Sequence, residues 1–322
     1  MNTINTLNEL LDQAIKCKSS DIHIEPQEEN SRVRFRTDGI LNEINSLSKD
    51  AHLQIVSRIK VISHLDIAEK RLPQDGRIQY QKMDLRISII PTCHGEKCVI
   101  RILNREHSLL SLENLGMQKE HLTLYHKMLQ RKTGILLVTG PTGSGKTTTL
   151  YASLNILNSS EVNISTIEDP IEYKLPGINQ IQVNYKTGLT FSRGLRSILR
   201  QDPDIIMIGE IRDEETAKIA IQSALTGHLV LSTLHTNDAV SAITRLKDIG
   251  IPNFLINATL IGVVAQRLAR KPQGGRIGIF EMFMVENNLQ EAISQNFKTL
   301  AEDGKEKIKL GLTTKEELWR II

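Results

Sequence analysis

The first forty or so residues change from helical to strand-like spacing of hydrophobic positions. From residue 4 to residue 16, apolar side chains recur every three or four positions, which predicts a helix with one buried face. The stretches DIHIE (21–25) and RVRFR (32–36) then alternate polar and apolar residues, as half-buried strands do. A helix followed by two such strands predicts the start of a small α+β unit.

The same pattern continues to about residue 103. Residues 51–65 again have helical spacing, and DLRISII (84–90) and KCVIRIL (97–103) alternate as two further strands. A turn through Cys93 to Gly95 is expected to join these strands. The alternation in the first of them places Arg86 on the polar face.

From Gly134 onward, short apolar stretches alternate with helical ones such as ETAKIAIQSAL (215–225). This alternation predicts a mostly parallel sheet covered by helices. The predicted strands are ILLVTG, NISTIED, DIIMIGE and HLVLSTL. The chain therefore divides into an expected N-terminal α+β domain, residues 1–110, and an α/β domain, residues 111–322, with a linker around Ser108 to Gly116.

Length, composition and charge exclude several classes of protein. A chain of 322 residues exceeds one typical core, and its formal charge of +3, without a basic block, predicts no nucleic-acid footprint. No apolar run has the eighteen or so residues of a membrane span, and the N-terminus lacks the pattern of a signal peptide. A cytoplasmic chain is expected. Its three cysteines cannot all pair with one another, which favours free thiols.

The stretch TGPTGSGKTTT (139–149) predicts a phosphate-binding loop. It satisfies the spacing G-x-x-x-x-G-K-[ST], and it lies between a predicted strand and a predicted helix. Backbone N–H groups of such a loop surround phosphate oxygens, Lys146 reaches the outer phosphates, and the Thr147 hydroxyl holds Mg²⁺. The expected nucleotide-binding residues are Gly140, Pro141, Thr142, Gly143, Ser144, Gly145, Lys146, Thr147 and Thr148.

Two acidic residues follow predicted strands at the edge where α/β sheets bind ligands. Glu168 ends TIE within TIEDPIEY and is a candidate to orient or deprotonate water. Glu210 ends DIIMIGE and is a candidate to reach Mg²⁺ through water, although glycine stands where an aspartate often precedes it. The alternative for each is a carboxylate that caps the next helix or turn.

Two histidines lie about one strand apart, at the two ends of LVLSTL. His235, at the far end, is a candidate sensor of the γ-phosphate, whereas His228 fits a hydrogen-bonded structural histidine equally well. Cys93, His94 and Cys98 lack the spacing of a zinc knuckle, so we interpret them as structural.

These stretches together resemble the secretion and pilus-assembly ATPases of type II secretion, type IV pili and competence pili. The resemblance runs from about residue 15 to about residue 285. The matching stretches, in the family's order, are SSDIHIEP, RVRFRTDGIL, RLPQDGRI, GPTGSGKTTTLYA, TIEDPIEY, LRQDPDIIMIGEIRDEETAKIAIQSALTGHLVLSTLHTNDA, VAQRLARK and GRIGIFEM.

The resemblance implies an α/β fold with a RecA-like P-loop ATPase domain after a small α+β, PAS-like domain. It also implies Mg²⁺-dependent ATP hydrolysis in a homo-hexamer at the inner face of the cytoplasmic membrane. Motion of the N-terminal domain of one subunit against its neighbour's ATPase domain would drive pilus assembly. The implied partners are a polytopic membrane platform protein and, indirectly, pilin-like subunits, and Arg86 and Arg101 match arginines that reach the nucleotide.

Two departures from the family pattern narrow the resemblance. Only ARKPQG stands where many members carry a four-cysteine insert, so no zinc is expected. The early position of SSDIHIEP makes the chain similar to the compact competence-pilus ATPases of Gram-positive bacteria.

Three alternatives remain open: a pilus-retraction ATPase of the same family, a P-loop nucleic-acid motor, and a non-enzymatic scaffold gated by nucleotide. Few aromatic residues and no basic cluster argue against the nucleic-acid motor, and Glu168 and Glu210 argue against the scaffold. No direct binding of nucleic acid is expected.

Overall fold

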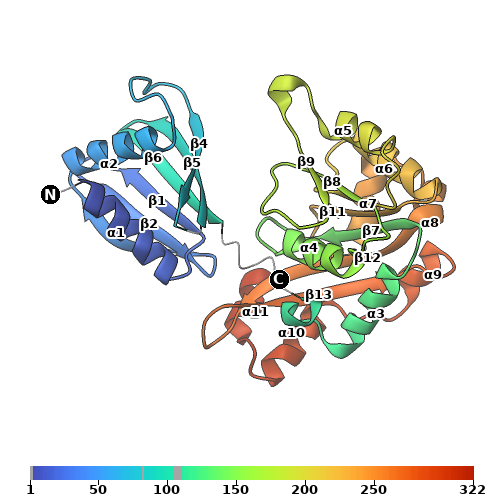
Figure 1. Cartoon of the computed structure of the whole chain (residues 1–322). Helices are drawn as coiled ribbons and strands as arrows, with labels where there is room; N and C mark the ends of the chain where they lie inside the picture. The colour runs from blue at the N-terminus through green and yellow to red at the C-terminus, as the bar shows by residue number, and fades with distance from the viewer. Residues whose placement is uncertain (1–2, 82, 104–110) are drawn as a thin grey trace. The chain divides into compact units, whose positions relative to one another are not determined.

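The computed structural model describes residues 3–81, 83–103 and 111–322, and the chain forms two compact units, 1–106 and 107–322 (Figure 1). The domain boundary was expected after residue 110. Residues 104–110, which include the first three residues of the expected linker, lie outside the described part. The second half of that linker contains a short 3₁₀ helix, Leu112–Leu115.

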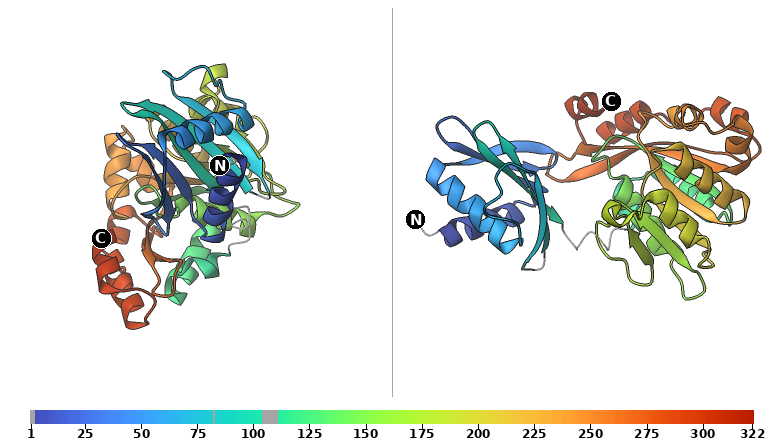
Figure 2. Two further views of the ribbon diagram at one scale, coloured as in Figure 1. Left: turned by 90° about the vertical axis from the view of Figure 1, so that its left-hand side faces the viewer. Right: turned by 90° about the horizontal axis from the view of Figure 1, so that it is seen from above.

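The N-terminal unit is an antiparallel sheet with two helices, α1 and α2, on the same face (Figure 2). Its strand order is β3-β2-β1-β6-β5-β4. The elements are α1 Thr3–Lys16, β1 Asp21–Pro26, β2 Ser31–Thr37, β3 Ile40–Leu47, α2 Lys49–Ile62, β4 Gln74–Tyr80, β5 Met83–Thr92 and β6 Gly95–Leu103. The predicted alternation is confirmed in β5, where Leu85, Ile87 and Ile89 are buried in the core.

Strands β3 and β4 were not predicted. Residues of β3 are mostly exposed, and β4 begins inside the turn-rich stretch RLPQDGR, so neither has a clear hydrophobic pattern. Helix α2 leaves no room for a side chain at Gly76 of β4, because a Cβ there would lie 2.9 Å from Cβ of Ser63 at the end of the helix. The glycine lets the strand approach the helix end closely.

The three cysteines are free thiols, and all of them belong to the N-terminal unit. Cys17 and Cys93 are exposed, whereas Cys98 is buried in β6. Burial raises the pKa of the Cys98 thiol to about 12, so this thiol is unreactive at neutral pH.

The second unit is a seven-stranded sheet in the order β13-β12-β7-β11-β10-β8-β9. All neighbouring strands are parallel except β13, which pairs antiparallel with β12. The strands are β7 Gly134–Thr139, β8 Ile164–Glu168, β9 Asn179–Gln182, β10 Ile205–Ile208, β11 Leu229–Leu234, β12 Leu260–Arg270 and β13 Arg276–Met284. The expected α/β fold with a mostly parallel sheet is confirmed.

Helices cover both faces of this sheet (Figure 1). One core contains residues of α3 and α4, and the other contains residues of α5 to α8. The helices are α3 Lys119–Leu129, α4 Lys146–Leu157, α5 Phe191–Ile198, α6 Glu214–Leu225, α7 Ser241–Asp248, α8 Asn253–Thr259, α9 Leu289–Ser294, α10 Leu300–Lys309 and α11 Lys315–Ile321. Among the described helices, none combines the length and the apolar character that crossing a bilayer requires.

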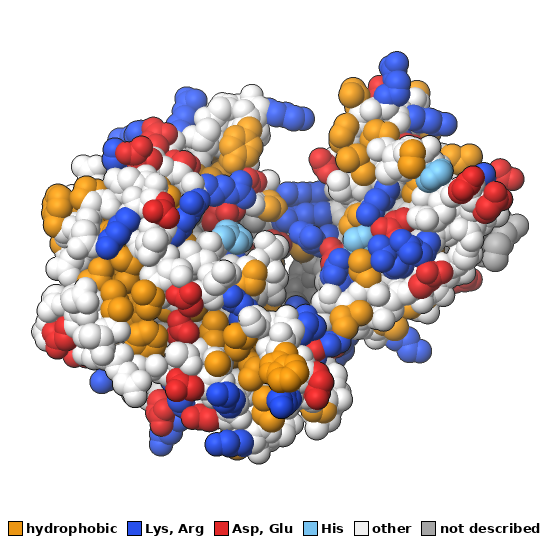
Figure 3. Space-filling model, turned by 180° about the vertical axis from the view of Figure 1, so that it is seen from behind, with side chains coloured by type: hydrophobic (Ala, Val, Ile, Leu, Met, Phe, Trp, Pro, Cys, Tyr) orange, Lys and Arg blue, Asp and Glu red, His pale blue; other side chains and the backbone are white. Residues whose placement is uncertain are grey.

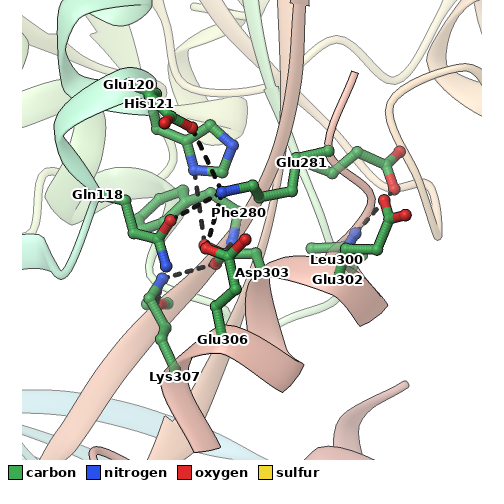
Figure 4. A network of polar contacts seen from close by, with 12 residues as sticks. Gln118, Glu120, His121, Phe280, Glu281, Leu300, Glu302, Asp303, Glu306 and Lys307 are labelled. Atoms are coloured by element: carbon green, nitrogen blue, oxygen red, sulfur yellow. Dashed lines mark hydrogen bonds and ion pairs between the residues drawn. The ribbon is translucent and has the colours of Figure 1, made fainter. Parts of the chain in front are cut away.

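A buried polar network holds α10 against β13 and α3 (Figure 4). Asp303 accepts hydrogen bonds from the Phe280 backbone N–H at 2.8 Å and from Lys307 Nζ at 2.6 Å. Lys307 also donates to the Gly278 carbonyl at 2.7 Å, and His121 Nδ1 lies 3.6 Å from an Asp303 oxygen. The Asp303 carboxylate and the Lys307 ammonium are almost completely buried, and their pairing compensates for the loss of water.

Candidate nucleotide-binding site

The loop between β7 and α4 has the geometry of a phosphate-binding loop. Strand β7 is buried along its whole length, and α4 begins at Lys146 after Gly145, whose φ of 90° is left-handed. The first backbone N–H groups of α4 have no partners within the helix, so the loop and the helix start together form an anion site.

Two loop glycines are also required by the neighbouring strand β12. A Cβ on Gly140 would lie 2.4 Å from the Gln266 carbonyl oxygen, and a Cβ on Gly145 would lie 2.8 Å from Gln266 Nε2. The Gln266 side chain accepts a hydrogen bond from Thr149 Oγ1 at 2.7 Å. Gln266 therefore packs against the loop and the start of α4, a role that the local sequence did not indicate.

Lys146 is held inside the loop. Its ammonium donates to the carbonyl oxygens of Gly140 at 2.8 Å and Pro141 at 3.0 Å. Burial lowers the Lys146 pKa to about 8, although the Glu210 carboxylate opposes this shift. Thr147, the expected Mg²⁺ ligand, is exposed at the helix start. A hydroxyl, a nearby ammonium and an acidic residue are the groups that a Mg²⁺–nucleotide complex requires.

Glu168 lies at the end of β8 and is only 3% exposed. Its carboxylate accepts hydrogen bonds from the Tyr151 hydroxyl, from Thr166 Oγ1 at 2.6 Å and from Gln180 Nε2 at 3.1 Å. Burial raises the Glu168 pKa, and these hydrogen bonds oppose the shift. The sequence indicated Glu168 but not Tyr151, Thr166 or Gln180, because only the folded chain shows which donors reach its carboxylate.

Glu210 follows β10 and lies beside His235. One Glu210 oxygen accepts a hydrogen bond from Arg212 Nη2 at 2.5 Å, and the other lies 3.6 Å from His235 Nε2. Burial and, next, the charge of Lys146 lower the His235 pKa, which keeps the imidazole neutral at pH 7. The structure thus gathers Lys146, Glu210 and His235 at the carboxyl ends of parallel strands.

His228 lies at the other end of β11, about 20 Å from His235 by the length of the strand. Its Nδ1 atom makes a 2.8 Å hydrogen bond with the Ser223 carbonyl oxygen at the end of α6. Of its two readings, the structural one fits this position.

Arg86 and Arg101 are directly opposite each other in the register of β5 and β6. Arg77 of β4 is in turn opposite Arg86, so three arginines form a row on the sheet face that α1 and α2 leave uncovered. Arg101 Nε donates to Asp21 at 2.9 Å, and its side chain is 60% exposed. The role of Arg86 and Arg101 at the nucleotide stays a prediction.

Within the described ranges, no group of three or more His, Cys, Asp and Glu side chains is arranged to hold a metal ion. A Mg²⁺ ion carried by nucleotide needs only one or two protein oxygens, which Thr147 and Glu210 offer.

The fold and the loop together define a P-loop ATPase with a RecA-like sheet. The family model described as "Type II/IV secretion system protein" matches residues 2–320, and the chain belongs to this family. It is an ATP hydrolase of the secretion and pilus ATPase class.

Two relatives cover almost the whole chain. Type II secretion system protein HxcR of Pseudomonas aeruginosa is 48% identical over 99% of this chain and 77% of its own length. Type II secretion system ATPase E of Vibrio cholerae is 45% identical over 99% of this chain and 75% of its own length.

Solved structures agree with this assignment. The pilus retraction motor PilT with bound ADP is 29% identical, with a TM-score of 0.73 over 98% of this chain and 96% of that chain. The Legionella pneumophila ATPase DotB has a TM-score of 0.81 over 98% of this chain and 95% of that chain, at 21% identity, and supports the fold alone.

Proposed function

We propose that this chain works as a cytoplasmic homo-hexamer that hydrolyses ATP with Mg²⁺ and drives assembly of a pilus-like fibre. The fibre is a type II secretion pseudopilus or a type IV or competence pilus. The observation that carries the proposal is the cluster of Lys146, Glu210 and His235 at the P-loop edge of the sheet. Membership of the secretion family supports the proposal that the energy of ATP hydrolysis drives fibre assembly.

Each residue of the site has a proposed role in the reaction. Lys146 and the loop N–H groups hold the outer phosphates, and Thr147 binds the Mg²⁺ ion that neutralises developing charge. Glu210 contacts that ion through water, Glu168 orients the attacking water, and His235 senses the γ-phosphate. Arg86 and Arg101 add positive charge from the N-terminal domain as the domains close.

The proposed partners follow from the same reading. The ring sits at the inner face of the cytoplasmic membrane, where a polytopic platform protein receives the motion and pilin-like subunits are moved indirectly. Neighbouring genes for pilin-like proteins and a polytopic membrane protein would support assembly.

Substitution of Lys146 tests the site directly. Lys146→Ala should abolish Mg²⁺-dependent phosphate release, whereas Lys127→Ala on the exposed side of α3 should leave it unchanged. Glu168→Gln should retain ATP binding and lose turnover. Undiminished hydrolysis in both site variants would show that the site is misassigned.

A retraction motor is the second candidate, because the solved PilT structure is similar along nearly the whole chain. The two directions are distinguished in cells. Deletion of an assembly ATPase removes surface fibres, whereas deletion of a retraction ATPase leaves fibres that no longer shorten.

A nucleic-acid motor is disfavoured by the charge distribution. On the face shown in Figure 3, Lys and Arg side chains are interspersed with Asp and Glu side chains. Any DNA binding should therefore be weak and should vanish near physiological salt. Salt-resistant binding, or hydrolysis stimulated strongly by DNA alone, would favour the nucleic-acid motor instead.

A further inference from the structure

The loop after β11, residues 235–239, carries His235 and is fixed at its start to the P-loop strand. The Thr236 backbone N–H donates to Thr139 Oγ1 at 3.0 Å, and the two threonine hydroxyls are 2.7 Å apart. Thr139 immediately precedes Gly140 of the P-loop. We call residues 235–239 the sensor loop, a name that rests on the proposed role of His235.

Arg267 of β12 joins the sensor loop to the last helix. Its side chain is 7% exposed and donates to the carbonyl oxygens of Asn237 at 2.6 Å, Ile321 at 3.1 Å and Gln266 at 3.0 Å. Asn237 belongs to the sensor loop, and Ile321 is the final residue of α11. One buried guanidinium therefore bonds to both segments at once.

Glu281 of β13 makes the matching connection to α10. Its carboxylate, on a residue that is 6% exposed, accepts from the Ala239 N–H at 2.8 Å and from the Leu300 N–H at 3.1 Å. Ala239 ends the sensor loop, and Leu300 begins α10. Figure 4 shows the Glu281 side chain directed at Leu300.

These contacts constrain how the sensor loop can move. A buried charge that loses a hydrogen bond without replacement is strongly destabilised, because water is not there to take the partner's place. Movement of the loop away from Arg267 or Glu281 would break such bonds. If either side chain follows the loop, its bond to α11 or α10 is kept only when that helix moves as well. Arg267 directly follows Gln266, which contacts the P-loop and Thr149, so the same stretch of β12 touches the nucleotide site and the helices.

We propose that Arg267 and Glu281 are positioning residues that set the sensor loop against the nucleotide and couple its position to α10 and α11. Binding of a γ-phosphate near His235 would then be reported at the C-terminal helices. This inference rests on the proposed function, and it adds a path from the nucleotide to the surface formed by those helices.

The chain carries a natural reporter of this coupling. Trp319 on α11 is the only tryptophan of the 322 residues, and it is 73% exposed. Lys315 Nζ, on the same helix, lies 4.8 Å from the centre of its ring and moves with it, so a shift of α11 changes the emission through the solvent and the groups outside the helix that surround the indole. Tryptophan emission therefore reports on α11 alone.

The decisive comparison is between Arg267→Gln and Arg270→Gln. Both arginines extend from β12 to α11. Arg267 also bonds to Asn237 of the sensor loop, whereas Arg270 bonds to Glu317 of α11, so Arg270→Gln serves as the matched control. The wild type should show different Trp319 emission with a non-hydrolysable ATP analogue and with ADP. Arg270→Gln should keep this difference and the wild-type kcat.

Arg267→Gln should lose the emission difference and about tenfold or more in kcat, while analogue binding, measured by displacement of a fluorescent nucleotide, changes less than about threefold. Arg267→Lys should recover part of both, because it keeps a charge but not the three-way fork. Glu281→Gln cannot accept from both N–H groups, because it replaces one carboxylate oxygen with an NH₂ group. It should lose the emission difference and kcat to a similar extent, and it tests the coupling if Arg267→Gln fails to fold.

The outcomes separate the two proposals. A wild type that neither binds nor hydrolyses ATP would refute the proposed function. Normal hydrolysis with an emission difference that survives in Arg267→Gln and Glu281→Gln would refute the coupling alone, as would equal losses in folded Arg270→Gln.

Discussion

At the scale of single residues, Glu168 shows how burial and hydrogen bonding oppose each other at one carboxylate. Burial raises its pKa, and donors from Tyr151, Thr166 and Gln180 favour the charged form. Removing one donor should therefore raise the Glu168 pKa further and reduce stability.

Tyr151→Phe removes one of these donors without changing the packed ring. We expect a loss of about 1.5–3 kcal/mol in the free energy of unfolding, as for a buried hydrogen bond to a charged group. If Glu168 acts as a carboxylate in turnover, the acid limb of the pH profile of kcat should also move to higher pH. Urea denaturation and the pH profile check the two effects.

Tyr185→Phe is the matched control, because its hydroxyl also donates to a carboxylate, Asp169 at 3.2 Å, but on a side chain that is 60% exposed. Its effect on stability should stay within about 0.5 kcal/mol. Equal effects of the two substitutions would contradict the importance assigned to burial.

Lys146 gives a prediction about pH. Its pKa of about 8 in the nucleotide-free protein means that the ammonium loses its proton as the pH rises through 8. Phosphate groups favour the charged form, so ATP binding at pH 9 should be weaker than at pH 7 and should take up a proton. Calorimetry in buffers of different ionisation enthalpy measures this uptake, and identical affinity at both pH values without uptake would exclude the depressed pKa.

At the scale of elements, the close contact between α10 and α11 depends on Gly304. A Cβ at this position would lie 2.1 Å from Cδ1 of Leu318, so Gly304→Ala should destabilise the protein even though alanine favours helices. A loss of about 1–3 kcal/mol is expected from overpacking. Thermal unfolding measures it, with Lys305→Ala on the exposed side of α10 as a neutral control. A more stable Gly304→Ala protein would mean that the helices separate freely.

Elements differ in how well the sequence predicts them. The P-loop and its flanking β7 and α4 were predictable because the motif and both hydrophobic patterns are local. Strands β12 and β13 were not, because the nearly continuous apolar run of β12 does not distinguish a buried strand from a helix.

The same reasoning applies to the candidate site. The spacing of Lys146, Glu210 and His235 relative to strand ends can be counted along the chain. Gln266 and Arg267 could not be found in this way, because their contacts reach residues such as Thr149 and Ile321 that only the sheet order brings near.

At the scale of the whole molecule, the row of Arg86 and Arg101 predicts that hydrolysis depends on the N-terminal unit. A positioned arginine contributes roughly a thousandfold or more in phosphoryl transfer. Arg86→Ala or Arg101→Ala should keep folding and ATP binding but lose most hydrolysis, and Arg→Lys should recover it only in part. Phosphate release and nucleotide binding are the measurements, with Arg193→Ala of the ATPase unit as a comparison because that arginine competes for the same role.

Mixed assemblies of the proposed ring test whether the arginines act across a subunit interface. Lys146→Ala chains and Arg101→Ala chains are inactive separately on this proposal, and a mixture regains activity if one site takes the two residues from different subunits. Absence of recovery would favour action within one chain, and full activity of the arginine variants alone would discard the idea.

The distribution of thiols has a practical consequence for following motion between the units. Every cysteine lies in the N-terminal unit, while the single tryptophan lies in the ATPase unit. In a Cys17→Ser chain, a dye that accepts energy from tryptophan would attach at exposed Cys93 and leave buried Cys98 unlabelled. Energy transfer from Trp319 to that dye depends on the distance between them, so a change in transfer during ATP turnover would report relative motion of the two units without any introduced cysteine or tryptophan.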